Sequence, residues 1–495
     1  MNVPVSDSAP DRGLYGVAAR GGAITLAAQA ARVVITLGST IWLARLIAPS
    51  EFGLFAMVIA ITGVSEILRD FGLSMAALRS VSLTQGQASN LFWINSAVGL
   101  ALTLMIFGLS WPISAFYAEP SLVPIVQIVA PVYFINGLTA QFRVAINRSL
   151  RFVALAWCDI IPLLSGLGIA VGFALMGAGV FALVAQQLSA ALITLVVAAA
   201  FAKWFPGWPR RRQQMRPLIT FGLHLTATQL LTYATRNVDS IAIGRVWGAG
   251  PLGYYDRAFQ LSVAPLNQLN APLSRVAIPV LSRVAQDPAR YSRALQKAQL
   301  LACYVTTSVL MLAAGLGVPL VELLLGPGWE FAGQIFSVLA LGSIFRALQQ
   351  IAYWMFMASG RAKSQLRLHL IAQPIVIATT LLGVPFGPLG VAVGNAIGCA
   401  LAWALSLWWA GRATGVPIRP LFTEATRAAL LFGAPAGAIA YVISTFIQGA
   451  PWAIVLLGLL GGAAWFALAW CFSKHVRSAL RSLGEFARSA VSPGR

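Results

Sequence analysis

Charge is scarce in this 495-residue chain. Charged residues make up only 10% of it, whereas soluble globular proteins carry about 25%. Hydrophobic residues make up 58%, and the mean hydropathy is +0.79. Because so few charges cannot cover a water-exposed surface, the composition excludes an ordinary soluble domain. The sequence therefore predicts an integral membrane protein.

Residues that usually carry enzyme chemistry are also few. The chain has three histidines, far apart, and four cysteines, none at metal-ligand spacing. It lacks a glycine-rich phosphate loop ending in GK[ST], which excludes an ATPase of its own. The loops expected outside the membrane are too short to hold a large catalytic segment. We therefore predict a protein that is not an enzyme and that has no metal or organic cofactor.

Long apolar runs fill most of the chain. About fourteen of them are long enough to cross a hydrocarbon core of roughly 30 Å as helices, so the predicted fold class is all-α and polytopic. We predict a cytoplasmic N-terminal tail at 1–20, a first six-helix lobe at 21–204, a linker at 205–216, a second six-helix lobe at 217–411, two extra helices at 412–473 and a basic cytoplasmic tail at 474–495.

The basic residues are distributed unevenly among the loops. Most of the 34 Lys and Arg residues fall in every second loop, and the opposite loops hold only Arg45 and Arg245. Such an asymmetry marks the cytoplasmic side of a membrane protein. It predicts an even number of spans with both termini in the cytoplasm. The net charge of +20 is then explained by topology, with no nucleic acid as a partner.

Two pairs of phrases indicate an internal repeat. ARLIAPSEFGLFAMV at 44–58 matches GRVWGAGPLGYYDRA at 244–258, and MGAGVFALVAQQ at 176–187 matches FGPLGVAVGNAI at 386–397. The phrases occupy corresponding places in the two predicted lobes, an even number of spans apart. Parallel repeats of this kind are typical of transporters.

Charged side chains inside the apolar runs are predominantly positive. Charge in a bilayer is costly unless it is paired or faces water, so this surplus predicts a cavity for an anionic substrate. Arg32, Arg143 and Arg346 lack a nearby acid in the sequence. The intramembrane arginines are Arg32, Arg69, Arg143, Arg236, Arg257, Arg275 and Arg346, and the acids are Glu66, Asp70, Asp159, Asp239 and Asp256.

Polar residues recur at helical spacing in the same runs, and amides and hydroxyls on one helix face suit a sugar. Structural readings stay open: Arg69 could pair with Glu66 or Asp70, Arg236 could pair with Asp239, and the amides could join helices. The candidate substrate-binding residues are Arg32, Arg143, Arg346, Arg236, Gln29, Asn136, Asn267, Gln268 and Gln349.

An ordered set of phrases resembles a known family. LARLIAPSEFGLFAMV at 43–58, DFGLSMAAL at 70–78, NRSLRF at 147–152 and NVDSIAIGRVWGAGPLGYYDRAFQL at 237–261 are similar to Wzx-like polysaccharide flippases of the multidrug/oligosaccharidyl-lipid/polysaccharide (MOP) exporter superfamily. The resemblance runs along roughly residues 15–470.

The resemblance implies two lobes in a V with alternating access between them and a cationic central cavity. It further implies an undecaprenyl-pyrophosphate-linked oligosaccharide as the substrate, membrane lipids and the polysaccharide polymerase or export machinery as partners, and the bacterial inner membrane as the location. Transport in the family uses ion gradients or the membrane potential, so H⁺ or Na⁺ coupling is expected. The resemblance identifies no coupling residue in this sequence, and Asp239, Asp159 and His224 are candidates for that role. A drug exporter of the same superfamily and a membrane glycan polymerase or ligase remain the alternatives.

Overall fold

The structure is a computed structural model that describes residues 12–70, 72–79, 83–210, 216–285, 287–472 and 477. Throughout these ranges the regular elements are helices. They contain eleven stretches long and apolar enough to cross a membrane. The predicted class, an all-α polytopic membrane protein, is confirmed.

The predicted number of fourteen spans stays a prediction. One of the eleven stretches, Lys363–Thr414, contains two successive helices, and the long helices over 216–247 and 249–284 are not among the eleven. The chain divides into two compact units, Met1–Ala234 and Thr235–Arg495. This division falls inside a helix, whereas the sequence places a linker at 205–216, and the predicted lobe boundaries also stay a prediction.

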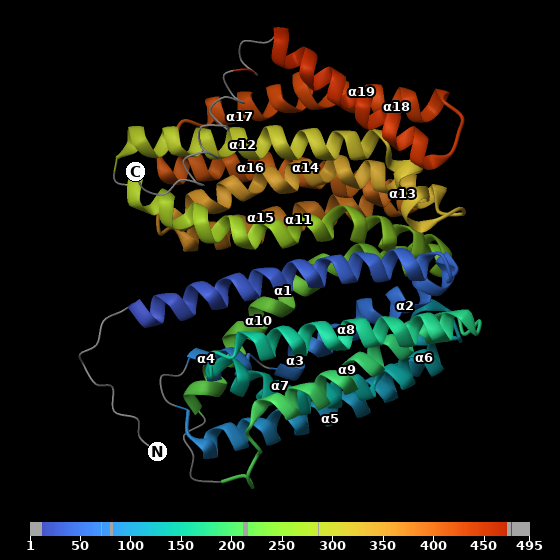
Figure 1. The fold of residues 1–495 in the computed structure, drawn as a ribbon, viewed down its shortest axis with the longest axis vertical. Helices are drawn as coiled ribbons and strands as arrows, with labels where there is room; N and C mark the ends of the chain where they lie inside the picture. The colour runs from blue at the N-terminus through green and yellow to red at the C-terminus, as the bar shows by residue number, and fades with distance from the viewer. Residues whose placement is uncertain are drawn as a thin grey trace. The chain divides into compact units, whose positions relative to one another are not determined.

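The described residues of the first unit form the helices named next, the last of which continues into the second unit (Figure 1). They are α1 (Arg12–Ala44), α2 (Pro49–Thr62), α3 (Val64–Asp70), α4 (Leu73–Arg79), α5 (Gln85–Tyr117), α6 (Leu122–Val129), α7 (Pro131–Arg148), α8 (Phe152–Leu175), α9 (Val180–Ala202) and α10 (Arg216–Trp247).

The second unit holds the remaining helices. They are α11 (Ala249–Val284), α12 (Pro288–Gly315), α13 (Gly317–Leu325), α14 (Glu330–Ala358), α15 (Ala362–Leu382), the 3₁₀ turn η1 (Val384–Phe386), α16 (Gly387–Thr414), α17 (Ile418–Arg427), the π-helical turn η2 (Ala428–Gly433), α18 (Ala434–Phe446) and α19 (Pro451–Phe472).

Helix packing follows the same order in both units. In the first, α5 packs on α7, α7 on α9 and α9 on α8. In the second, α12 packs on α14, α14 on α16 and α16 on α15. A short helix precedes α7 and another precedes α14 at the corresponding place. This recurrence is the three-dimensional form of the repeat seen in the sequence, and α18 and α19 are added beside α12 and α13.

The repeated phrases form corners between helices. In the first unit Glu51 Oε2 accepts a hydrogen bond of 2.7 Å from Val180 N–H, at the start of α9. In the second, Trp247 Nε1 donates to the Val384 carbonyl at 2.7 Å, just before α16. The first phrase thus connects the α1–α2 corner to the start of α9. The second phrase connects the α10–α11 corner to the turn before α16.

Helix starts follow local capping chemistry. Thr84 caps α5 in a reciprocal capping box with Gln87, and Asp287 accepts from the first backbone N–H groups of α12, whose first residue is Pro288. Close helix contact then depends on small residues. A Cβ at Gly99 of α5 would lie 2.7 Å from the Tyr133 carbonyl oxygen of the α6–α7 region. The glycine therefore permits the close approach of α5 to α7.

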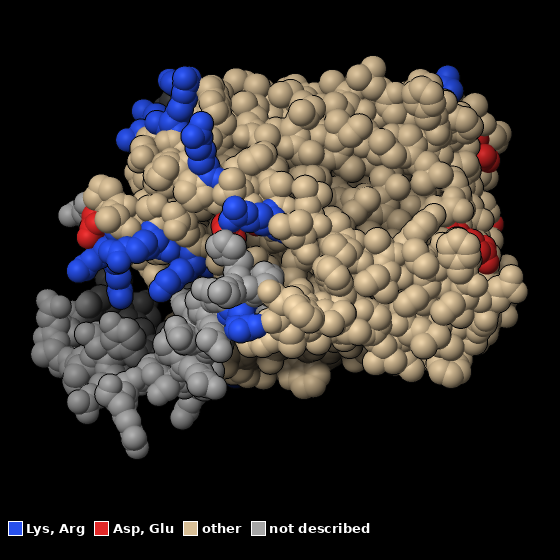
Figure 2. Space-filling view, turned by 90° about the horizontal axis from the view of Figure 1, so that it is seen from above, with Lys and Arg blue, Asp and Glu red and all other residues tan. Residues whose placement is uncertain are grey.

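Basic side chains gather at one end of the second unit. Arg283, Arg290, Arg361, Arg412 and Arg419 are exposed near the connections α11–α12, α14–α15 and α16–α17. Figure 2 shows most of the blue side chains at one end of the face that it draws, with some red ones among them, and mainly red ones at the other end. Arg245 lies at the opposite ends of these helices. The asymmetry predicted from the sequence is therefore also present in space.

Candidate functional site

The first unit contains a pocket with a volume of about 760 Å³. Six polar residues at helical spacing, four on α7 and two on α1, form much of its wall. They are Asn136, Thr139, Arg143, Asn147, Gln29 and Arg32. The residues on α7 are three or four positions apart, which places them on one helix face. Candidates from two predicted spans therefore line one pocket.

Other helices bring acidic groups to the same wall. Glu66, Arg69 and Asp70 come from α3, and Asp159 comes from α8. Together with Arg32 and Arg143, the described lining holds three arginines and three carboxylates. The surplus of positive charge predicted from the sequence is therefore absent from this pocket.

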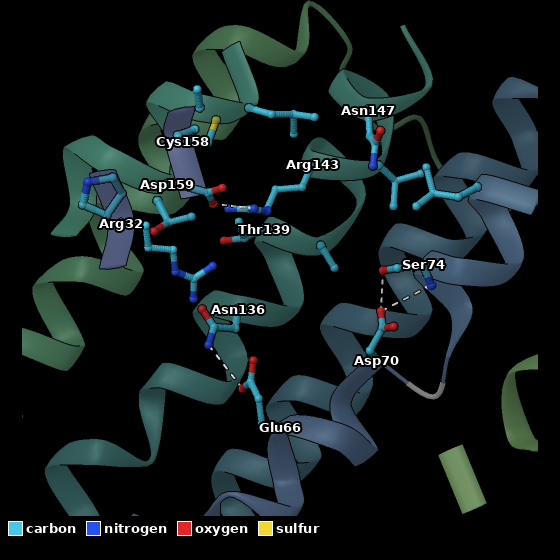
Figure 3. Close-up of a pocket in the computed structure, with 18 of the residues that line it drawn as sticks. Arg32, Glu66, Asp70, Ser74, Asn136, Thr139, Arg143, Asn147, Cys158 and Asp159 are labelled. Carbon is cyan, nitrogen blue, oxygen red and sulfur yellow. Dashed lines mark hydrogen bonds and ion pairs between the residues drawn. The ribbon is translucent and has the colours of Figure 1, made fainter. Parts of the chain in front are cut away.

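Arg143 is paired with an acid that lies far from it in the sequence. Its Nη2 donates to Asp159 Oδ1 at 2.6 Å, from α7 to α8 (Figure 3). Both side chains are partly exposed to the pocket, 37% for Arg143 and 29% for Asp159. The absence of a nearby acid in the sequence thus did not predict an unpaired arginine. A candidate for substrate binding and a candidate for ion coupling form one ion pair.

Arg69 is held by two partners. Its Nη2 donates to Glu66 Oε1 at 2.8 Å, and its Nη1 donates to the backbone carbonyl of Asn136 at 2.7 Å. Glu66 also accepts from Asn136 Nδ2 at 3.4 Å. These bonds fix α3 to α7, which is the structural role left open by the sequence. Asp70, the last residue of α3, accepts from the hydroxyl and backbone N–H of Ser74 near the start of α4.

Arg32 differs from the other two arginines of the pocket. It projects from α1 into the pocket (Figure 3), and its side chain has no hydrogen bond or ion pair to another residue in the described part of the chain. A guanidinium group offers up to five N–H donors in a planar fork that fits carboxylate and phosphate oxygens. Arg32 is therefore the group in this pocket most open to an anionic ligand.

The second unit contains a separate polar cluster. Asp239 is 5% exposed and accepts from the Tyr255 hydroxyl at 2.8 Å and from the Ser240 N–H at 2.8 Å. Arg346 donates to Asn395 Oδ1 at 3.3 Å. Asp239 thus accepts from two donors within its own unit, and Arg346 has a neutral amide of the same unit as a hydrogen-bond partner.

The remaining candidates have different outcomes. Gln349 donates to Ser406 Oγ at 2.9 Å and so joins α14 to α16, in line with the structural interpretation of the amides. The side chains of Arg236, Asn267, Gln268 and His224 lie outside what the structure describes. Within the described ranges, no three His, Cys, Asp or Glu residues converge as a metal site would require.

Sequence reasoning did not select several groups that the structure places at these sites. Ser74 and Cys158 line the pocket, and Tyr255 is the hydroxyl partner of Asp239. Ser74 lies four residues after Asp70, one residue beyond the spacing of a helix N-cap, so a search for caps would not have found it. Tyr255 is sixteen residues from Asp239 on the next helix, where no periodic pattern links them.

Comparison with known proteins gives consistent results. The family model described as "Polysaccharide biosynthesis protein" matches residues 42–332. The lipopolysaccharide biosynthesis protein WzxC of Escherichia coli (strain K12) is 22% identical over 72% of this chain and 73% of its own length. A putative O-antigen transporter of Shigella flexneri is 22% identical over 76% of this chain and 93% of its own length.

A solved structure of the lipid II flippase MurJ, in an inward closed conformation, is similar in fold. It has a TM-score of 0.69 and 14% sequence identity over 91% of this chain and 98% of that chain. At this identity the similarity concerns the fold alone. Since the family model covers more than half of the sequence, the chain belongs to the polysaccharide biosynthesis protein family.

Proposed function

We propose that this protein is a flippase that carries a lipid-linked oligosaccharide across the membrane for the assembly of a surface polysaccharide. Family membership and similarity to a putative O-antigen transporter support this function. The structural observation that carries it is Arg32, whose guanidinium group lines a polar pocket and has no hydrogen bond or ion pair to any residue that the structure describes. The protein is a transporter and not an enzyme.

The pocket has the chemistry to take the headgroup of such a lipid. Arg32 would bind the diphosphate, because a guanidinium group recognises phosphate oxygens in a bidentate manner. Asn136, Thr139 and Asn147 supply amide and hydroxyl groups that can bond sugar hydroxyls. Its volume of about 760 Å³ lies within the roughly 300–1,000 Å³ typical of small-ligand sites. It fits a diphosphate with its first sugars better than a polymer.

The pocket would lower the desolvation cost of moving the charged headgroup across the membrane. A sugar diphosphate would have to leave water to cross the roughly 30 Å hydrocarbon core unaided. Within the pocket, fixed charges and hydrogen-bonding groups replace that water. The two internal ion pairs, Arg143–Asp159 and Arg69–Glu66, keep the empty pocket near neutrality. Arg32 then provides a guanidinium group whose N–H donors can bond the anion, since it has no hydrogen bond or ion pair to another described residue.

We further propose that transport is coupled to a gradient of H⁺ or Na⁺. Asp159 lines the pocket beside Arg143, and Asp239 is buried in the second unit, so each is placed to respond to an ion. Transport by reconstituted protein, measured with an imposed gradient of either ion alone, distinguishes the two. Equal rates with and without both gradients would refute coupling.

The expected location is the bacterial inner membrane, with both termini in the cytoplasm. The support is the basic end of the second unit, because basic loops face the cytoplasm. Cysteines introduced at Arg419 and Arg245 should be labelled from opposite sides by a membrane-impermeant maleimide. Labelling of both from the outside would contradict this orientation.

A drug exporter of the same superfamily is the second candidate, and one cellular experiment separates it from the flippase. Arg32→Ala should abolish surface polysaccharide and cause its lipid-linked precursor to accumulate in the cytoplasmic leaflet, with the protein still present in the membrane. Arg45→Ala, which changes an arginine at the α1–α2 corner, is the control. Normal polysaccharide output from Arg32→Ala would refute the proposed role of this pocket.

A further inference from the structure

The segment of residues 203–210 leaves α9 without helical structure and is fastened to the start of α5 (Figure 1). Asn90 donates to the Arg210 carbonyl at 2.8 Å and accepts from the Arg210 N–H at 2.8 Å. Ser89 Oγ accepts from the Gly207 N–H at 2.9 Å, and Trp93 Nε1 donates to the Gly207 carbonyl at 3.0 Å. Three side chains in two turns of α5 therefore bind both polar backbone groups of Gly207 and of Arg210.

These bonds fix the segment to α5 at two points. The N–H and carbonyl groups of Gly207 and of Arg210 are bonded to side chains of α5. Pro206 and Pro209 between and beside these points restrict the backbone further, because a proline ring fixes φ. The position of the segment against the start of α5 is therefore defined by protein contacts.

Its side chains divide into buried and exposed aromatic groups. Trp204 packs edge-on against Phe142 of the core, with ring centroids 5.9 Å apart. Phe205 is 74% exposed and Trp208 is 84% exposed, and Trp208 stacks on Trp93 with ring centroids 6.3 Å apart. The inward contacts hold the segment in place, so the exposure of Phe205 and Trp208 is a fixed feature of the surface.

Basic groups flank these aromatic ones. Lys203 and Arg210 are exposed at the two ends of the segment. The segment begins where α9 ends and lies on the first turns of α5, and both helices are candidate membrane spans. It is thus at the level where a hydrocarbon core gives way to lipid headgroups. Aromatic residues with Lys and Arg are characteristic of that level on the cytoplasmic side.

We propose that residues 203–210 form an interfacial membrane anchor that binds an anionic lipid surface. Phe205 and Trp208 insert among the headgroups, and Lys203 and Arg210 contact lipid phosphates. The occupant is the bilayer and not a partner protein, because exposed aromatic rings between two basic residues at the end of a candidate membrane span match a lipid interface. The chain that leads toward the second unit then starts from a point fixed to the membrane surface. This anchor does not depend on what the protein transports.

The test measures the depth of a spin label in nanodiscs made of phosphatidylcholine and phosphatidylglycerol. The label is placed at Phe205→Cys in a Cys471→Ser background, where the other three cysteines are buried. Leu104→Cys, 66% exposed on α5, is the reference for hydrocarbon, and Asp287→Cys is the reference for water. The label at 205 should show lower access to a water-soluble nickel complex and higher access to oxygen than the label at 287. Equal accessibility at 205 and 287 would overturn the proposal.

Two further variants of the labelled protein test the named contacts. Trp208→Ala removes an exposed ring, so folding should be preserved, and the label should become more accessible to the nickel complex. Trp111→Ala, an exposed tryptophan farther along α5, is the matched control and should change nothing. Replacing Lys203 and Arg210 by Gln should abolish any difference between anionic and purely zwitterionic nanodiscs. A label that leaves water only when other membrane proteins are added would instead assign the surface to a protein partner.

Discussion

The ion pair between Arg143 and Asp159 allows a quantitative test of the pocket. The two charged groups are 2.6 Å apart, and their side chains are 37% and 29% exposed. The burial of this ion pair is therefore intermediate between that of a surface pair and that of a fully buried pair. Exposed pairs contribute about 0–1 kcal/mol, and removing one partner of a fully buried pair costs about 3–5 kcal/mol. We therefore expect Arg143→Gln and Asp159→Asn each to lower the free energy of unfolding by about 2 kcal/mol, since each leaves an unmatched charge.

The double variant should not add these two losses. With both charges removed, the total loss should be about 2 kcal/mol rather than about 4, which gives a coupling energy of about 2 kcal/mol. Denaturant titration of the purified protein in micelles, followed by circular dichroism, measures all four forms. The same cycle on Arg427 and Glu424, which are 3.6 Å apart within one helix with Arg427 50% exposed, should give about 0.5 kcal/mol or less. A coupling energy for Arg143 and Asp159 no larger than this control would refute the assigned pairing.

Three further predictions concern stability. Glu51→Gln should cost about 1 kcal/mol, measured by the same titration, because a charged acceptor is lost from the N-terminus of α9; an unchanged titration would contradict this. Gly99→Ala should destabilise the protein, since its Cβ would lie 2.7 Å from the Tyr133 carbonyl oxygen. Gly108→Ala on the same helix is the control, because its Cβ would have no atom within 4 Å, and it should be neutral or stabilising. Equal effects of the two substitutions on stability would be inconsistent with close packing at Gly99. Hydrogen bonds from the first N–H groups of α12 lower the pKa of Asp287, so Asp287→Asn should lower the melting temperature above about pH 4, with the difference vanishing in more acidic buffer; a difference that grows with acidity would reverse the expected sign.

The helical fold and one wall of the pocket could be predicted from the sequence for a physical reason. A helix repeats every 3.6 residues, so Asn136, Thr139 and Arg143 had to share a face, and one long polar face in an apolar chain had to meet something other than lipid. The corners between helices were found because the phrases around Glu51 and Trp247 recur at a fixed offset.

Contacts between helices could not be predicted in the same way. Asp159 reaches Arg143 from a helix that begins after a sharp turn, and Arg69 reaches a backbone carbonyl of α7, which no sequence pattern encodes. Charges separated by many residues become neighbours only through tertiary packing. For this reason, the sequence overestimated the number of unpaired positive charges in the pocket. Of the three arginines in its described lining, Arg32 is the one with no bonded partner among the described residues.

The central claim is that the pocket of the first unit binds the anionic headgroup during transport. The most direct test reconstitutes the protein in liposomes that contain a fluorescent polyprenyl-diphosphate oligosaccharide. Dithionite, added outside, bleaches only outer-leaflet probe, so flipping appears as loss of the protected fluorescence. The account predicts rapid loss with the unchanged protein and with Arg45→Ala, and loss at the rate of protein-free liposomes with Arg32→Ala. Equal flipping by Arg32→Ala and the unchanged protein would contradict it.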